Sequence, residues 1–173
     1  MHILLTGNTT FKLANFRAGL ISRLIKDGHR VTVMAPPDDY VATIRQMGCD
    51  FAPLDMDRNG VSPLAEMRLF YTIFLNLYHK RPSFVFSYTI KNNIYSGLAC
   101  RFLGIPFAAN VTGLGPAFNQ AGLFNRLIRF LYQLSFRRAA AVFFQNEDDR
   151  ATFLEGNLVP DKAVHLLPGS GVD

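Results

Sequence analysis

The sequence predicts an α/β fold in which helices cover both faces of a mainly parallel, doubly wound sheet. Short apolar runs alternate with longer segments of helical periodicity along the whole chain, and such alternation is typical of parallel strands joined by right-handed crossovers. Glycine follows several of the helical segments, as in Asp27-Gly28-His29 and Met47-Gly48, and glycine commonly ends a helix. A chain of 173 residues is long enough for one domain with a substantial core.

Short apolar runs bounded by turn residues are the predicted strands. In chain order these runs are Ile3–Leu5, Arg30–Ala35, Phe51–Leu54, Phe84–Tyr88, Phe107–Val111, Ala141–Gln145 and Val164–Leu167. Because the segments between them have helical periodicity, the strands are predicted to pair in parallel.

The segments between the strands are the predicted helices. In chain order they are Asn15–Asp27, Tyr40–Met47, Pro63–His79, Asn92–Leu103, Leu123–Arg138 and Glu147–Leu154. This spacing of strands and helices predicts a Rossmann-like, doubly wound domain. In such domains ligands bind beyond the carboxyl ends of the strands, where the strand order reverses. The loops that follow the strands are therefore the places to look for a binding site.

The net charge is +5, and its distribution is more informative than its size. No aspartate or glutamate occurs from Met67 to Asn146, whereas arginine and lysine recur throughout that stretch. Such a field attracts phosphate groups, on a nucleotide, a nucleic acid or an anionic membrane surface. A basic domain whose acidic residues lie elsewhere in a larger protein is the alternative. Nucleic-acid binding is not predicted, because no RNA- or DNA-binding motif is present.

The sequence gives no indication of a membrane span, a signal peptide or a metal site. It contains no run of about 18 uncharged apolar residues, and Met1-His2 leads directly into a predicted strand. Cys49 and Cys100 are isolated in apolar surroundings without metal-ligand spacing. We therefore predict a cytoplasmic protein with reduced cysteines, no metal and no bound cofactor.

The loop after the first predicted strand lacks a dinucleotide-binding fingerprint. Gly7 is followed by "NTTF", without the further glycines that G-x-G-x-x-G requires. The segment instead offers polar and charged side chains suited to sugar hydroxyls or phosphate, and those we predict to bind a ligand are Asn8, Thr9, Thr10, Asn15 and Arg17. Lys12 adds a cation to the same loop. The alternative is that threonine and asparagine only cap a helix that begins at Asn15.

Two further loops on the same sheet edge have features of an anion site. "SYTIKNNIYSGL" places Lys91 between a strand and a helix capped by Asn92 or Asn93, and the start of a helix attracts anions. "NVTGLGPAFNQAG" follows the next strand, and its Thr112, Gly113 and Gly115 allow backbone amides to face a ligand. Glycine-rich loops are often only tight turns, but two such loops on one edge favour an anionic ligand.

Two predicted helices have more apolar surface than contact with one sheet face requires. The segment Leu123–Arg138 has an apolar arc on one side and arginines on the other, a pattern typical of helices that bind a membrane interface. The residues we predict to contact the membrane are Phe124, Arg126, Ile128 and Arg129. The alternative is a helix buried against the sheet or against a neighbouring domain.

Several motifs together resemble the N-terminal half of a family-four retaining glycosyltransferase of the GT-B fold. They are "GNTTFKLANFRAGLISRLIKDGHRVTVMAP", "TIKNNIYSGLACRFLGIP", "NVTGLGPAF", "VFFQNEDDRATFLEGNLVP" and "LLPGSGVD". The resemblance covers essentially the whole chain and is nearest to bacterial enzymes of capsule, exopolysaccharide or lipid-linked oligosaccharide assembly. It implies that residues 1–173 are the acceptor-binding domain, and that the donor-binding C-terminal domain is absent.

The resemblance also implies ligands and partners. The acceptor is expected to be a polysaccharide or a polyprenyl-diphosphate-linked sugar, held by the polar residues named above, while a nucleotide-sugar donor binds the C-terminal domain. The cleft between the two domains is expected to involve Asn146, Glu147, Gly169 and Gly171. The enzyme would then work at the inner face of the cell membrane, against its anionic surface.

The resemblance leaves the catalytic residues unknown. Many family members carry a histidine after the strand that corresponds to Phe107–Val111, but "NVTGLG" stands here. The alternative function, from a different class, is a non-catalytic α/β domain that binds a nucleotide or another anionic ligand.

Overall fold

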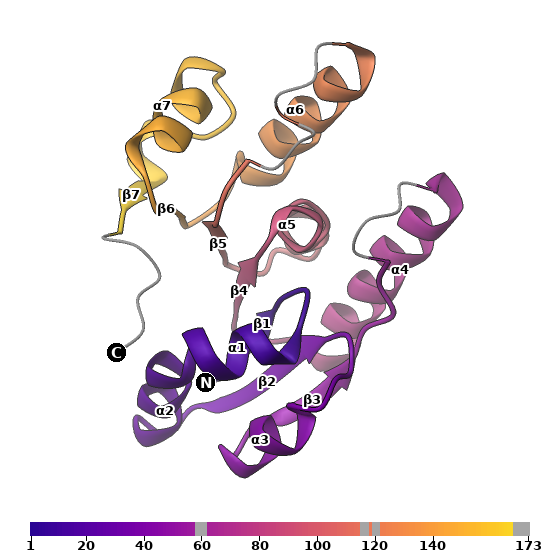
Figure 1. The fold of residues 1–173 in the computed structure, drawn as a ribbon, viewed down its shortest axis with the longest axis vertical. Helices are drawn as coiled ribbons and strands as arrows, with labels where there is room; N and C mark the ends of the chain where they lie inside the picture. The colour runs from indigo at the N-terminus through magenta and orange to yellow at the C-terminus, as the bar shows by residue number, and fades with distance from the viewer. Residues whose placement is uncertain (58–61, 115–117, 119–121, 168–173) are drawn as a thin grey trace.

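A computed structural model describes residues 1–57, 62–114, 118 and 122–167, and its fold confirms the predicted α/β class (Figure 1). The described strands are β1 (His2–Thr6), β2 (Arg30–Ala35), β3 (Asp50–Pro53), β4 (Phe84–Tyr88), β5 (Phe107–Val111), β6 (Ala141–Phe144) and β7 (Val164–Leu166). They form one sheet in the order β3-β2-β1-β4-β5-β6-β7, and every neighbouring pair is parallel. Each predicted strand occurs within one residue of its expected ends.

The helices divide between the two faces of the sheet (Figure 1). They are α1 (Thr10–Phe16), α2 (Ala18–Lys26), α3 (Val41–Gln46), α4 (Pro63–Lys80), α5 (Ile90–Leu103), α6 (Leu123–Phe136) and α7 (Glu147–Glu155), and a short 3-10 helix, η2 (Asp161–Ala163), precedes β7. The buried residues of α1, α2 and α3 form one core cluster with β1 and β2. Those of α4, α5, α6 and α7 form a second cluster with strands across the sheet.

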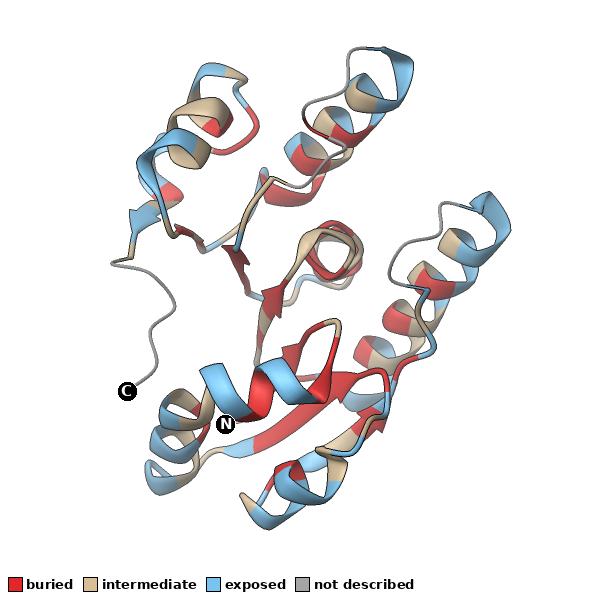
Figure 2. Ribbon diagram, viewed as in Figure 1, coloured by how far each residue is buried: buried red, intermediate tan, exposed pale blue. Residues whose placement is uncertain are grey.

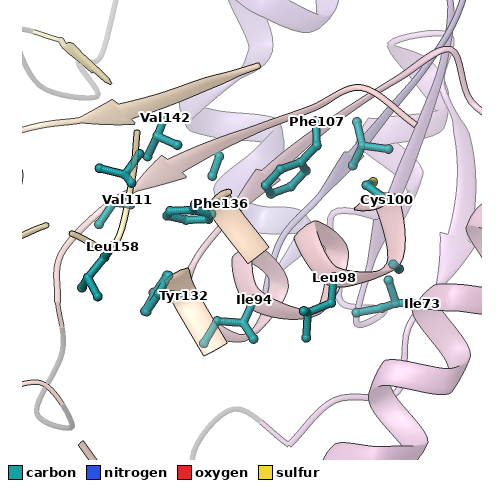
Figure 3. Close-up of a cluster of buried hydrophobic side chains, with 14 of the residues drawn as sticks. Ile73, Ile94, Leu98, Cys100, Phe107, Val111, Tyr132, Phe136, Val142 and Leu158 are labelled. Carbon is teal, nitrogen blue, oxygen red and sulfur yellow. The ribbon is translucent and has the colours of Figure 1, made fainter. Parts of the chain in front are cut away.

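The second cluster is the larger core, and α5 lies at its centre (Figure 3). Ile94 and Leu98 of α5 pack among Ile73 of α4, Phe107 of β5 and Tyr132 of α6. Because α5 contacts the sheet and both neighbouring helices, most of its surface is buried (Figure 2). Burial of apolar area contributes about 25 cal/mol per Å² to folding. The Asn93 side chain of α5 also donates to the Asn110 carbonyl at 2.9 Å, which ties the start of α5 to the carboxyl end of β5.

The predicted start of the first helix at Asn15 is wrong. Helix α1 begins at Thr10, because the Thr9 hydroxyl accepts a hydrogen bond from the amide of Lys12 at 3.0 Å, as an N-cap does. The predicted single helix is also interrupted at Arg17, whose backbone (φ −129°, ψ 12°) leaves the helical region between α1 and α2.

The predicted cap of α5 by Asn92 or Asn93 is also wrong. The N-cap is Thr89, which makes no capping hydrogen bond through its side chain and has φ +75°. A β-branched residue at positive φ is uncommon and costs about 1–3 kcal/mol. Such strain is concentrated at functional sites in proteins, and Thr89 stands at the carboxyl end of β4.

Candidate functional site

The strand order reverses between β1 and β4, so the carboxyl ends of these two strands mark the switch point of the sheet. The chain runs outward from β1 through β2 and β3 on one side, and from β4 through β5, β6 and β7 on the other. The loops after β1 and β4 therefore diverge, and a crevice opens between them.

A pocket of about 240 Å³ occupies this crevice, and we refer to it as the switch-point pocket. It is lined by Gly7, Asn8, Lys12, Leu13, Phe16, Arg17, Tyr88, Thr89, Thr112 and Gln145. A second hollow of about 270 Å³, the Lys91 pocket, is lined by Asn8, Met56, Thr89, Ile90, Lys91, Thr112 and Gly113. The two pockets share Asn8, Thr89 and Thr112, so they form one continuous site along the sheet edge.

Two cations line the switch-point pocket, and none of its described lining residues is acidic. The guanidinium of Arg17 lies over the ring of Tyr88, 4.7 Å from the ring centre, a contact that holds its charge in place. Burial raises the pKa of Tyr88 to about 12, although Arg17 opposes the shift, so the phenol stays neutral at pH 7. Lys12 projects from the exposed side of α1. The pocket is therefore positively charged.

Asn8 gives this pocket an unsatisfied acceptor. Its Oδ1 atom is buried and has no hydrogen-bond partner among the described residues. A buried polar atom without a partner costs about 1–3 kcal/mol, so a donor from outside the protein, from water or from a ligand, is expected at this atom. A ligand that carries hydroxyl groups would supply the missing donor.

Three of the residues predicted to bind a ligand make hydrogen bonds within the protein. Thr9 caps α1, and Thr10 is fully buried with its amide and hydroxyl both bonded to the carboxylate of Asp38. Asn15 is exposed, donates to the Phe11 carbonyl at 2.8 Å and lines neither pocket. The early start of α1 explains these positions.

Lys91 and Asn92 are also engaged within the protein. The Lys91 ammonium lies 2.5 Å from Glu66 Oε1 and donates to the Asp57 carbonyl at 2.7 Å, while it lines the Lys91 pocket. Asn92 is fully buried and lines neither pocket. Its Oδ1 accepts the Thr6 hydroxyl at 2.7 Å, which joins α5 to β1.

The remaining predicted site residues fall in three groups. Thr112 and Gly113 line the site, and Gly113 has φ +138°, which favours glycine. Gly115, Gly169 and Gly171 lie outside the described residues. Asn146 caps α7 by accepting the amide of Asp149, and Glu147 pairs with Arg150 in the first turn of that helix.

Helix α6 places only some of its predicted membrane residues outward. Phe124 and Arg126 are exposed, but Ile128 is 8% exposed and belongs to the core. Arg129 lies over the ring of Phe118, 5.4 Å from its centre. The prediction that Ile128 faces a membrane is therefore wrong, because the apolar arc is wide enough to supply both the core and an outer surface.

Sequence reasoning missed several residues of the site region, among them Tyr88, Gln145 and Glu66. Tyr88 and Gln145 line the switch-point pocket from strand ends, and Glu66 pairs with Lys91 from α4. Their positions at or just after predicted strands were a usable signal for the first two residues. No local pattern signals that Glu66 reaches Lys91 across the sequence.

The fold and the site together define a Rossmann-like domain with a cation-lined ligand pocket at its switch point. The chain belongs to the glycosyl transferase 4-like domain family, whose model matches residues 14–169. It is 27% identical over 164 residues to the N,N'-diacetylbacillosaminyl-diphospho-undecaprenol alpha-1,3-N-acetylgalactosaminyltransferase of Campylobacter jejuni. The aligned region is 92% of this chain and 43% of the Campylobacter protein. The chain thus spans less than half the length of this curated relative.

Solved structures share the fold at low sequence identity. The Anabaena protein Alr3699/HepE, solved in complex with UDP-glucose, matches with a TM-score of 0.68 and 13% identity over 100% of this chain and 44% of its own. The UDP-GlcNAc 2-epimerase of Methanocaldococcus jannaschii matches with a TM-score of 0.63 and 12% identity, covering 95% of this chain and 44% of its own. An epimerase has this fold too, so the reaction does not follow from the fold.

Proposed function

We propose that this chain is the acceptor-binding half of a retaining glycosyltransferase that moves a sugar from a nucleotide-sugar to a polyprenyl-diphosphate-linked acceptor. The single observation that carries the proposal is the switch-point pocket, with Lys12 and Arg17 and no described acidic residue in its lining. Family membership supports glycosyl transfer. The name of the Campylobacter relative, which acts on a sugar linked through diphosphate to undecaprenol, supports the class of acceptor.

The chemistry of the pocket suits an acceptor that is anionic at one end and a sugar at the other. Lys12 and Arg17 would neutralise the diphosphate, and arginine is suited to phosphate because its planar donors match two oxygens at once. Asn8 and Thr112 would bind sugar hydroxyls. The contribution of this half to the rate would be to hold the acceptor hydroxyl in line with the donor.

The proposal includes a donor-binding half in the full-length protein and contact with a membrane through exposed apolar residues. Exposed apolar residues lie on the N-terminal halves of α4 and α6, namely Leu64, Met67, Tyr71, Leu123, Phe124 and Leu127, and we refer to them as the apolar rim. A helix that follows a parallel strand begins at the carboxyl edge of the sheet, so α4 and α6 begin at the edge that holds the pocket. Figure 2 shows that the N-terminal ends of these two helices are exposed. Among the described residues, no helix has the length and hydropathy needed to cross a bilayer.

A membrane-bound acceptor would meet the enzyme at this edge. The apolar rim would enter the head-group region, and the basic surface would be drawn to the anionic cytoplasmic leaflet. The products would be capsule, exopolysaccharide or another cell-surface glycan.

The test uses the full-length protein with a nucleotide-sugar and a polyprenyl-diphosphate-linked sugar. We expect sugar transfer, and we expect Lys12→Ala and Arg17→Ala each to raise the acceptor KM about tenfold or more, the size of one charge-assisted contact. Arg23→Ala is the matched control, because Arg23 is an exposed arginine of α2 that pairs with Asp27 away from the pocket.

Two outcomes would contradict the proposal. If the enzyme transferred sugar equally well to a water-soluble acceptor without phosphate, the pocket would not be a diphosphate site. No transfer to any acceptor, together with tight binding of a free nucleotide, would favour the alternative of a non-catalytic anion-binding domain.

A further inference from the structure

The ammonium of Lys91 is held by a carboxylate that belongs to a different helix. Glu66, in the first turn of α4, places Oε1 2.5 Å from Lys91 Nζ. Its other oxygen, Oε2, accepts the hydroxyl of Tyr95 at 2.7 Å. Tyr95 follows Lys91 by one turn of α5, so a single carboxylate bridges two residues on the same face of that helix.

This arrangement is shielded from solvent and well fixed. The side chains of Lys91 and Glu66 are each 19% exposed, so water screens their attraction less than at an open surface. Burial and the neighbouring Glu66 carboxylate raise the pKa of Tyr95 above its usual value, which keeps its hydroxyl protonated and donating. The ring of Phe70 packs 6.2 Å from that of Tyr95 and supports it.

Lys91 lines the ligand site but Glu66 does not. A ligand in the Lys91 pocket therefore meets an ammonium group whose charge is already offset by Glu66, a residue outside the pocket. Glu66 is the last acidic residue before the acid-free stretch that starts at Met67. None of the described residues that line the two pockets carries a carboxylate, so the charge that balances Lys91 comes from outside the site.

We propose that Glu66 is a specificity-determining residue: its carboxylate offsets the charge of Lys91 from outside the ligand site, so an acceptor must carry several negative charges, as a diphosphate does, to gain from this lysine. This inference rests on the proposed function, because it assumes that a diphosphate enters the site. The Glu66 carboxylate and a ligand would share the same ammonium, one from outside the pocket and one from within it. A neutral sugar gains little from a lysine whose charge is already offset, whereas a diphosphate presents several charged oxygens to it.

The test measures the binding of inorganic pyrophosphate to the protein by calorimetry at constant salt. We expect Glu66→Gln to tighten binding about tenfold, because no carboxylate then offsets the charge of Lys91. Tyr95→Phe should tighten binding by a smaller factor, because it loosens Glu66 without changing any charge. Lys91→Met should weaken binding, and Glu66→Gln should give no gain in the Lys91→Met background.

Asp55→Asn is the matched control, because it removes one negative charge from the exposed connection between β3 and α4. A purely structural ion pair predicts that Glu66→Gln lowers thermal stability and leaves affinity unchanged or weaker, so a gain in affinity separates the two roles. The inference is overturned if Glu66→Gln matches Asp55→Asn, or if its gain persists without Lys91.

The outcomes also separate this inference from the proposed function. If pyrophosphate binding depended on Lys12 and Arg17 but did not change with Glu66→Gln, the inference about Glu66 would be overturned and the proposed function would stand. No pyrophosphate binding by the wild-type protein would overturn both.

Discussion

Arg17 lies over the ring of Tyr88 with 4.7 Å between its guanidinium carbon and the ring centre. The contact joins the break between α1 and α2 to the carboxyl end of β4, so it spans the switch point. The break gives Arg17 a non-helical backbone, and its side chain therefore follows a direction that a continuous helix would not give. An interruption in a helix and a strand end together place one cation in the pocket.

Replacement of Arg17 should separate charge from geometry. We expect Arg17→Ala to weaken pyrophosphate binding about tenfold, and Arg17→Lys to recover only part of the loss, because lysine lacks the planar guanidinium. Titration calorimetry at two salt concentrations measures both effects. If the lysine variant bound pyrophosphate as tightly as the wild type, only the charge of Arg17 would matter. If neither variant changed the affinity, Arg17 would not contact the ligand.

The alternation of strand and helix could be predicted from sequence because each strand is a dense apolar run. β2, for example, reads "RVTVMA", and its last five residues are buried. The beginning of α1 could not be predicted in the same way. Its first turn is stabilised by Asp38, whose carboxylate accepts the amides of Thr10 and Phe11 across 28 and 27 residues. A cap supplied from another loop leaves no local pattern.

The site was predicted in part, for the same reason. Asn8, Thr112 and Gly113 line it because loops after parallel strands meet at one edge. Thr10 and Asn92 were expected there on their polarity, but buried polar side chains in a close-packed domain more often bond the backbone or one another. The pairing of Lys91 with Glu66 is a tertiary contact, which one sequence without related sequences does not reveal.

Asp38 should contribute to stability at neutral pH through the start of α1. Burial alone would raise its pKa, but hydrogen bonds from the Thr10 hydroxyl and from three backbone amides outweigh this and hold the pKa below its usual value. The folded pKa is depressed, so the contribution is complete above the unfolded value of about 3.9 and is lost as the pH falls through the folded pKa.

We therefore expect Asp38→Asn to lower the free energy of unfolding by about 1 kcal/mol at pH 7. The difference from the wild type should shrink below about pH 4, where the wild-type carboxylate becomes protonated. Urea denaturation at several pH values measures it. Asp39→Asn, at the exposed neighbouring position, is the control, and an equal loss there would show a general charge effect.

Gly97 should be irreplaceable in the contact between α5 and α6. A Cβ atom added there would lie 2.9 Å from Ser135 Cβ and 3.1 Å from Phe107 Cε1, closer than packed carbon atoms approach. We expect Gly97→Ala to destabilise the protein by about 1–3 kcal/mol, as overpacking does, despite the better helix propensity of alanine. Gly19→Ala, on the exposed side of α2, should be neutral or stabilising by up to about 1 kcal/mol. Thermal unfolding compares the two, and equal midpoints would contradict the packing argument.

The apolar rim should bind anionic membranes through side chains that the fold does not need. Leu123 and Leu127 are 84% and 50% exposed, whereas Ile128, the next residue of the helix, is in the core. We expect the Leu123→Ser, Leu127→Ser double variant to keep its unfolding temperature but to lose most of its cosedimentation with vesicles containing phosphatidylglycerol. Phe102→Ser is the matched control, because Phe102 is 73% exposed near the C-terminal end of α5, away from the apolar rim.

The charge on α6 should contribute to the same membrane contact. Arg126→Glu should reduce binding at low salt and have little effect at 1 M salt, where the Debye length falls to about 3 Å. If the double variant and the Phe102 variant sediment equally with the vesicles, the exposed residues of α6 do not contact the membrane, and a protein surface becomes the better explanation for them.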